Sequence, residues 1–110
     1  MQTVSAGDRS SWKDFTIAVD HEVFGVDRDQ LRSVLSAEGI DTRTYFDPPV
    51  HRQSAYRHVP SRELPVTDDV SRRVVSLPVY PALPGAAVDG IVRVIAAAHD
   101  KSTALSGLRR

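Results

Sequence analysis

Side chains that could form a ligand-binding site gather in one short segment, residues 41–56. Its aromatic rings offer flat apolar surfaces, and its histidine can donate a hydrogen bond to a hydroxyl or phosphate oxygen near neutral pH. The alternative is that the aromatic residues belong to the core of a sheet and that the histidine only caps a turn. We predict that five residues of the segment bind substrate: Tyr45, Phe46, His51, Arg52 and Tyr56.

Two consecutive prolines, Pro48 and Pro49, restrict the backbone in the middle of this segment. Each proline fixes φ near the polyproline value and disfavours the helical region for the residue before it. We therefore expect residues 45–47 to be extended where they enter a turn. The side chains that follow the turn should be held in place.

Other kinds of site find less support in the sequence. His51 and His58 match no helical or zinc-finger spacing, and no cysteine or close carboxylate pair completes a metal site. Asp68 and Asp69 stand where we expect a helix to begin, so they are better explained as dipole-stabilising carboxylates than as an acid-base pair. No glycine-rich phosphate loop and no nucleophile-elbow motif is visible. We predict neither a metal site nor a catalytic residue.

The composition limits the chain to one small domain with a thin core. It has 110 residues, 41% of them hydrophobic and 25% charged, with a net charge of zero and no cysteine. Scattered charges of both signs do not supply the field that nucleic acid or an anionic membrane surface requires. The polar N-terminus lacks the apolar stretch of a signal peptide, and no apolar run is long enough to cross a bilayer. We expect a cytoplasmic protein.

The first half of the chain predicts a strand, a helix and a second strand. Apolar residues alternate along residues 15–19, with the period of a strand that buries one face. After a short connection, Asp27 and Gln30 form the capping-box pattern that opens a helix, and Gly39 is suited to end it. Residues 40–46 are then expected to be extended.

The second half predicts a long loop, a helix, a strand and a final helix. The loop covers residues 47–65 and contains a helical turn at residues 52–57. Thr67 is expected to cap the next helix, a short strand should occupy residues 76–79, and Pro84 suits the first position of the last helix.

This order of elements predicts an α+β fold, a small three-stranded sheet with covering helices. Three short strands stay incomplete unless helices or a partner cover the open face. We expect this unit to span residues 12–101, between a flexible N-terminal segment, residues 1–11, and a flexible tail, residues 102–110.

Five blocks of sequence, spaced between Asp14 and His99, form an ordered pattern: Asp27-Arg28-Asp29, Gly39-Ile40-Asp41-Thr42-Arg43, Tyr45-Phe46-Asp47-Pro48-Pro49-Val50-His51, Leu64-Pro65-Val66-Thr67 and Ser76-Leu77-Pro78-Val79-Tyr80. In this order and spacing they resemble DegT/DnrJ/StrS-type sugar aminotransferases. The resemblance covers only the C-terminal small domain of those enzymes, which are fold-type I transferases dependent on pyridoxal phosphate. The predicted sheet and helices are expected to take the fold of that domain.

The resemblance implies transfer of an amino group, commonly from glutamate, to a keto sugar carried on a nucleotide. The cofactor of the parent family is pyridoxal phosphate, held on a lysine of the large domain. The lysines here, Lys13 and Lys101, occupy no comparable position. We therefore expect this chain alone to bind no cofactor covalently, and its partner to be a large cofactor-binding domain or subunit. The resemblance also allows a homodimer in the intact family.

Three functions stay open at this point. The chain could be the C-terminal portion of such an aminotransferase, inactive alone, or a subunit that completes a split aminotransferase. It could also be a non-catalytic module that binds sugar nucleotides or another protein. In an aminotransferase, the resemblance implies that the segment around His51 forms a wall over the substrate.

Overall fold

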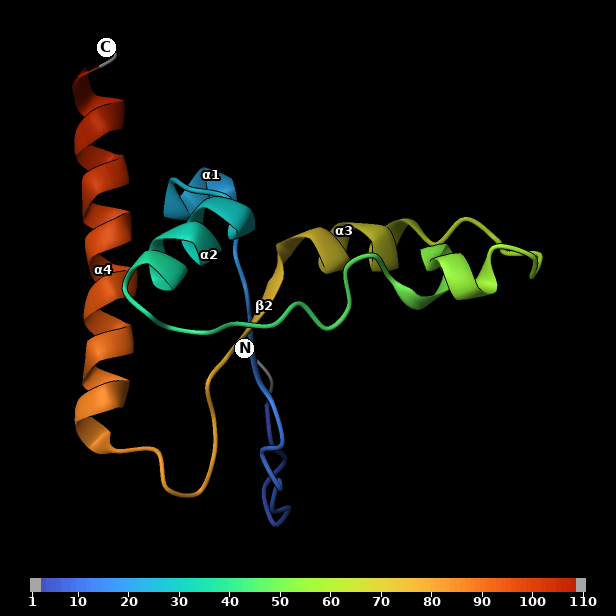
Figure 1. Ribbon diagram of the computed structural model, residues 1–110, viewed down its shortest axis with the longest axis horizontal. Helices are drawn as coiled ribbons and strands as arrows, with labels where there is room; N and C mark the ends of the chain where they lie inside the picture. Colours follow the sequence, from blue (N-terminus) through green and yellow to red (C-terminus); the bar gives the residue numbers. More distant parts are fainter. Residues whose placement is uncertain (1–2, 109–110) are drawn as a thin grey trace.

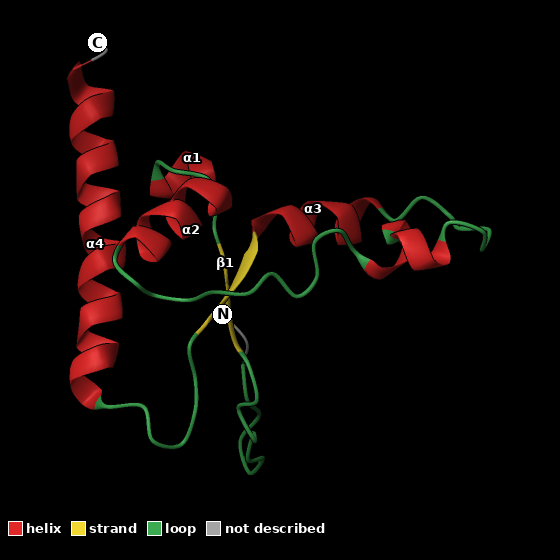
Figure 2. Cartoon of the chain, in the orientation of Figure 1, coloured by secondary structure: helices red, strands yellow, loops and turns green. Residues whose placement is uncertain are grey.

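A computed structural model describes residues 3–108 of the chain, with side chains to residue 103, as an open arrangement of helices around a small sheet (Figure 1). Helix α4 stands on one side of the sheet, and α3 with the loop before it extends to the other side (Figure 2). The strands are β1, Phe15–Ala18, and β2, Val74–Leu77. The helices are α1, His21–Phe24; α2, Arg28–Ala37; α3, Pro65–Arg73; and α4, Gly85–Leu108. Two 3₁₀ turns, Val50–Arg52 and Ser54–Tyr56, interrupt the loop before α3.

The sheet has two antiparallel strands in the described residues, so the α+β class is confirmed and the predicted three-stranded sheet is wrong. The expected strand over residues 40–46 contributes a single bridge. There the Arg43 N–H donates to the Ser76 carbonyl at 3.1 Å, and the Ser76 N–H donates to the Arg43 carbonyl at 2.7 Å. Pairing stops because a turn follows, closed by the Asp47 N–H and the Thr44 carbonyl, and carries the chain towards α3.

Strand β2 begins two residues earlier than predicted, and helix α3 begins three residues earlier. Helix α3 starts at Pro65 and has no side-chain cap, so Thr67 lies inside its first turn and does not cap it. A proline fits there because the first helical N–H groups have no intrahelical acceptor. The helix passes directly into β2 at Val74, and β2 ends before Pro78, which has no N–H to continue the ladder.

Helix α2 follows the sequence prediction closely. The Asp27 carboxylate accepts from the Gln30 N–H at 2.8 Å, and the Gln30 side chain accepts from the Asp27 N–H at 2.9 Å, which completes the capping box. Gly39 has a positive φ of 74° just after the helix. The apolar face of α2 carries Leu31 and Leu35, both fully buried.

Helix α1 lies where the sequence predicts only a connection, and it holds the C-terminal half of α4. The Phe24 carbonyl accepts hydrogen bonds from His99 Nδ1 at 2.9 Å and from Ser102 Oγ at 3.1 Å, and the Phe24 and His99 rings stack. Helix α4 therefore continues to Leu108, through most of the segment predicted as a tail. Residues 1–2 and 109–110, parts of the two predicted flexible ends, lie outside the described residues.

The core is small and the surface is correspondingly large. The buried cluster comprises Val19, Leu31, Leu35, Val75 and Ala98. The accessible surface is 8537 Å², whereas a compact protein of this mass exposes about 6000 Å². The radius of gyration is 16.5 Å, against about 13 Å for a compact domain of this length.

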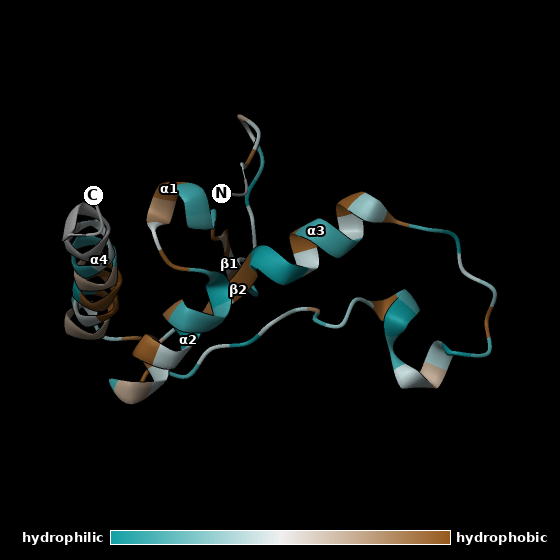
Figure 3. Cartoon of the chain, turned by 90° about the horizontal axis from the view of Figure 1, so that it is seen from above, coloured by the Kyte–Doolittle hydropathy of each residue, from teal (hydrophilic) through white to brown (hydrophobic). Residues whose placement is uncertain are grey.

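Several helices carry apolar residues (Figure 3), and some of these residues are exposed. Val23 on α1, Val66 on α3 and Val92 on α4 are 77%, 75% and 59% exposed. Among the described residues, no helix combines the length and the apolar character needed to cross a membrane. The exposure of these valines leaves a large apolar area for a domain that stands alone.

Gly25→Ala should destabilise the fold more than Gly39→Ala. Both glycines have positive φ, 90° and 74°, so each substitution strains the backbone by about 1 kcal/mol. A Cβ at Gly25 would also lie 2.1 Å from Ser102 Oγ, whereas a Cβ at Gly39 would meet nothing within 4 Å. Urea denaturation should therefore show a larger loss of unfolding free energy for Gly25→Ala. Equal losses would contradict the packing of α4 against α1.

Candidate functional site

A groove of about 700 Å³ lies between α3 and the loop that precedes it. Helix α3 contributes apolar side chains to its lining, among them Val66 and Val70. On the loop side the groove is lined by four of the five residues that the sequence predicts as substrate-binding: Tyr45, Phe46, His51 and Tyr56. The groove is therefore mostly apolar, with an imidazole, two phenols and the hydroxyl groups of Ser61, Thr67 and Ser71 as polar groups.

The aromatic side chains of the groove are not part of the sheet core. Tyr45, Phe46 and Tyr56 are 44%, 55% and 46% exposed. The Tyr45 and Phe46 rings lie against each other, with centroids 5.1 Å apart. The alternative that Tyr45 and Phe46 are core residues is wrong, because both lie beyond the point where the backbone leaves the sheet.

Arg52, the fifth predicted residue, does not line the groove and instead anchors the loop to α3. Its Nε and Nη2 donate to the two carboxylate oxygens of Asp68, at 2.6 and 2.5 Å. The hydrogen bond from Arg52, followed by its positive charge, holds the pKa of Asp68 below its ordinary value, and the same pairing raises the pKa of Arg52. Asp68 is therefore a carboxylate throughout the neutral pH range.

Asp68 also faces His51, which lies one residue before Arg52 in the loop. His51 Nε2 is 3.2 Å from Asp68 Oδ1, within ion-pair distance. The nitrogen is nevertheless buried and has no hydrogen bond with a favourable angle to any described residue. Both side chains are largely enclosed, with 15% of His51 and 14% of Asp68 exposed.

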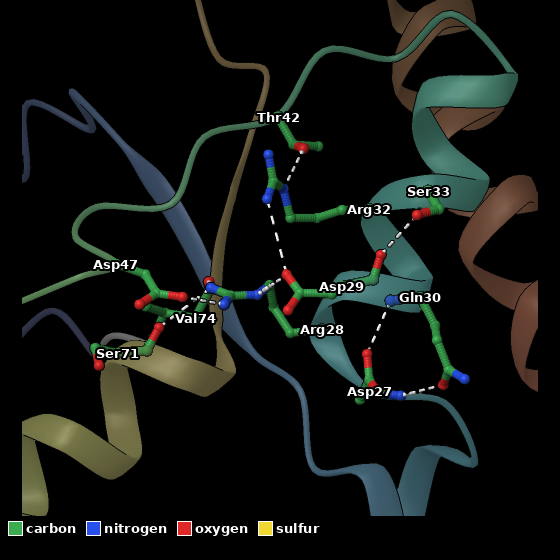
Figure 4. A network of polar contacts seen from close by, with 10 residues as sticks. All are labelled: Asp27, Arg28, Asp29, Gln30, Arg32, Ser33, Thr42, Asp47, Ser71 and Val74. Carbon is green, nitrogen blue, oxygen red and sulfur yellow. Dashed lines mark hydrogen bonds and ion pairs between the residues drawn. The ribbon is translucent and has the colours of Figure 1, made fainter.

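A second ion pair holds the other end of the loop. The guanidinium of Arg28 is 3% exposed and pairs with the carboxylate of Asp47, which follows the groove residue Phe46 (Figure 4). Its Nη1 donates to the carbonyls of Ser71 and Val74, at 3.1 and 3.0 Å. Arg28 thus joins α2, the end of α3, the start of β2 and the loop.

Sequence reasoning missed Arg28, Asp47 and the pairing role of Asp68. A signal for Arg28 was present, because it stands three and seven residues before Leu31 and Leu35 and so lies on the buried face of α2. Asp68 does lie in the first turn of a helix, as predicted, but its carboxylate also binds a side chain sixteen residues earlier.

Among the described residues, the groove has no lysine that could hold pyridoxal phosphate. The cofactor requires a lysine amine as its Schiff-base partner. Neither Lys13 nor Lys101 lines the groove, and both are exposed. Lys101 instead lines a separate hollow of about 940 Å³ between α2 and α4. No chemical step through the cofactor can therefore be assigned to the described residues.

Comparison with known proteins identifies the family. Residues 1–96 match the DegT/DnrJ/EryC1/StrS aminotransferase family. The chain belongs to this family. Its members are pyridoxal-phosphate enzymes, and the residues that line the groove, from Tyr45 to Val74, lie within the matched residues.

Relatives in the family are several times longer than this chain. The chain is 40% identical over 74 residues to dTDP-3-amino-3,4,6-trideoxy-alpha-D-glucose transaminase of Streptomyces venezuelae, which covers 66% of this chain and 18% of that enzyme. A solved aminotransferase of the family from Brucella abortus superimposes with a TM-score of 0.73 and 37% identity, over 88% of this chain and 25% of that chain. The structure of DesI in the presence of its TDP-sugar product gives a TM-score of 0.72 and 30% identity over the same shares. The chain therefore corresponds to about a fifth to a quarter of these proteins.

Arg28→Ala should destabilise the protein by about 3 kcal/mol, because it leaves Asp47 and two inward-facing carbonyls without their buried partner. Arg32→Ala removes a matched side chain one turn later on α2, which is 39% exposed, and should cost less than about 1 kcal/mol. Urea denaturation followed by circular dichroism measures both. Similar small losses for the two variants would show that Arg28 does not hold these elements together.

Proposed function

We propose that this chain forms the substrate-covering wall of a pyridoxal-phosphate aminotransferase that acts on a nucleotide-linked keto sugar. The observation that carries the proposal is the aromatic groove beside α3, found in a member of an aminotransferase family. The substrate class is supported by two relatives, one named as a dTDP-sugar transaminase and one solved with a TDP-sugar product. The catalytic lysine would come from elsewhere.

The groove residues suit the binding and orientation of a sugar. The half-exposed faces of Tyr45, Phe46 and Tyr56 can pack against the apolar face of a sugar ring and exclude water from it. His51 can exchange a hydrogen bond with a hydroxyl group. Since Arg52 is neutralised by Asp68, the groove offers little positive charge for a diphosphate. We therefore assign the sugar, and not the diphosphate, to this wall.

We further propose that the chain is inactive alone and acts with a large lysine-bearing domain or subunit. The groove has no lysine among the described residues, so the amine must be supplied from another part of the assembly. The surface exceeds that of a compact protein by about 2500 Å², more than the roughly 800 Å² that each partner buries in a standard interface. This excess favours a part that packs against a large domain or subunit over a self-sufficient binding module. A homodimer of the assembled enzyme and a cytoplasmic location stay predictions.

Complementation tests this function directly. The segment that this chain matches is removed from the Streptomyces venezuelae relative. The shortened relative and this chain are then purified and assayed, separately and mixed, for transamination of a dTDP-keto sugar. Activity should appear only in the mixture, and borohydride treatment should fix the cofactor on the large half alone. A chain that formed a stoichiometric cofactor adduct and transaminated the sugar without a partner would overturn the proposal.

In the active mixture, replacing Tyr45 and Phe46 together by alanine should lower kcat/KM by at least about tenfold, since each lost ring contact is worth about 1 kcal/mol. The matched control exchanges the rings, Tyr45→Phe with Phe46→Tyr, and should keep most of the activity. If the alanine variant matched the ring-exchanged control, these residues would not contact the substrate. Binding of dTDP-sugar without turnover in any mixture would instead favour a non-catalytic module.

A further inference from the structure

The ring of His51 lies in an unusual environment. It lines the groove and is largely enclosed, yet its buried Nε2 makes no hydrogen bond with the described residues, although Asp68 Oδ1 is 3.2 Å away. A buried polar atom without a partner costs free energy, and a small tilt of the ring would turn this contact into a hydrogen bond. The arrangement therefore places a buried ring nitrogen beside a carboxylate oxygen.

Asp68 is the rigid member of the pair. Its N–H donates to the Leu64 carbonyl at 2.9 Å, and its carbonyl accepts from Ser71 Oγ at 3.0 Å. The Ser71 carbonyl in turn accepts from the buried Arg28. A chain of hydrogen bonds thus connects the centre of the fold to the carboxylate that faces His51.

The charge state of Asp68 determines what it can do to the imidazole. The hydrogen bond from Arg52 lowers the pKa of Asp68 below its ordinary value of 3.8. Asp68 is therefore a carboxylate at any pH above 3.8, and it is protonated only as the pH falls through the lowered pKa. At neutral pH it can only accept a hydrogen bond. Two other charged groups influence the pair: the positive charge of Arg72 also lowers the pKa of Asp68, and the negative charge of Glu63 raises the pKa of Arg52. Neither replaces Asp68 as the acceptor for His51, because Arg72 is a cation and Glu63 influences Arg52.

We propose that Asp68 is a positioning residue that keeps the proton of His51 on Nε2, so that Nδ1 is a hydrogen-bond acceptor for a hydroxyl of the bound ligand. A carboxylate behind a histidine fixes the tautomer and the ring orientation in many sites. The identity of the ligand as a sugar rests on the proposed function, whereas the tautomer of His51 does not. Arg52 contributes by holding the carboxylate in place with its two donors.

Nuclear magnetic resonance of the ¹⁵N-labelled full chain tests the tautomer. The His51 ring signals, identified by their loss in His51→Gln, should show the Nε2–H form and a slowly exchanging Nε2 proton above pH 7. The proton signal should disappear in Asp68→Ala and return in Asp68→Glu. The matched control is Asp69→Ala, since that neighbouring carboxylate pairs with Arg73 at 2.6 Å and should leave His51 unchanged.

An Nδ1–H tautomer in the unmodified chain, or a His51 signal that ignores the loss of Asp68, would overturn the inference. If Asp68→Ala does not fold, Asp68→Asn decides, because it keeps the shape of the side chain and removes the carboxylate charge. A slowly exchanging Nε2 proton in Asp68→Asn that matches the unmodified chain would show that the carboxylate does not fix the tautomer.

Addition of a dTDP-hexose to the same samples separates this inference from the proposed function. In the assembled enzyme or the chain alone, binding should move the Nδ1 resonance of His51 together with the signals of Tyr45 and Phe46. If Tyr45 and Phe46 respond while Nδ1 does not, the role of His51 as an acceptor is wrong and the groove is still the sugar site. If no groove signal responds in either sample but the tautomer is as predicted, the proposed function fails and the positioning role of Asp68 stands.

Discussion

The fold depends on one buried guanidinium, that of Arg28. A cation removed from water has to find its hydrogen bonds within the protein, and Arg28 finds them on α3, on β2 and on the loop that carries Asp47. Because the guanidinium is planar and its donors diverge in fixed directions, the three elements cannot shift independently. This matters more than usual here, since the hydrophobic cluster is too small to fix the arrangement by packing alone.

The groove depends on Arg28 and on a second ion pair, in which the loop supplies the cation and the helix supplies the carboxylate. At the start of the loop the carboxylate of Asp47 pairs with the buried Arg28, and further along the loop Arg52 pairs with Asp68 of α3. The segment between these contacts carries His51, and the aromatic rings on either side of it, those of Tyr45, Phe46 and Tyr56, are half-exposed and line the groove together with apolar residues of α3. Among the described residues, the groove has no amine for imine chemistry, and the chain matches a quarter of the length of these solved relatives.

The parts of this structure that the sequence predicts are those determined by neighbouring residues. The capping box of Asp27 and Gln30 and the glycine after α2 act within a few residues, and both are found as expected. The prediction of a third strand was wrong for two reasons. Its pairing depends on Ser76 of β2, more than thirty positions away, and the chain leaves the sheet after Arg43, where Asp47 pairs with Arg28. A pattern of alternating or extended residues carries no information about such a distant partner.

The candidate site was also predicted only in part from the sequence. Residue type and the rigid Pro-Pro pair were enough to select Tyr45, Phe46, His51 and Tyr56, which do lie around one groove. They were not enough for Arg52, since its role is set by a carboxylate on α3 that only the folded chain brings near. The most direct measurement of the central claim is a crystal structure of this chain assembled with a lysine-bearing large half and a dTDP-sugar. We predict the sugar ring against Tyr45 and Phe46 with a hydroxyl at His51; a sugar bound away from this groove would contradict the account.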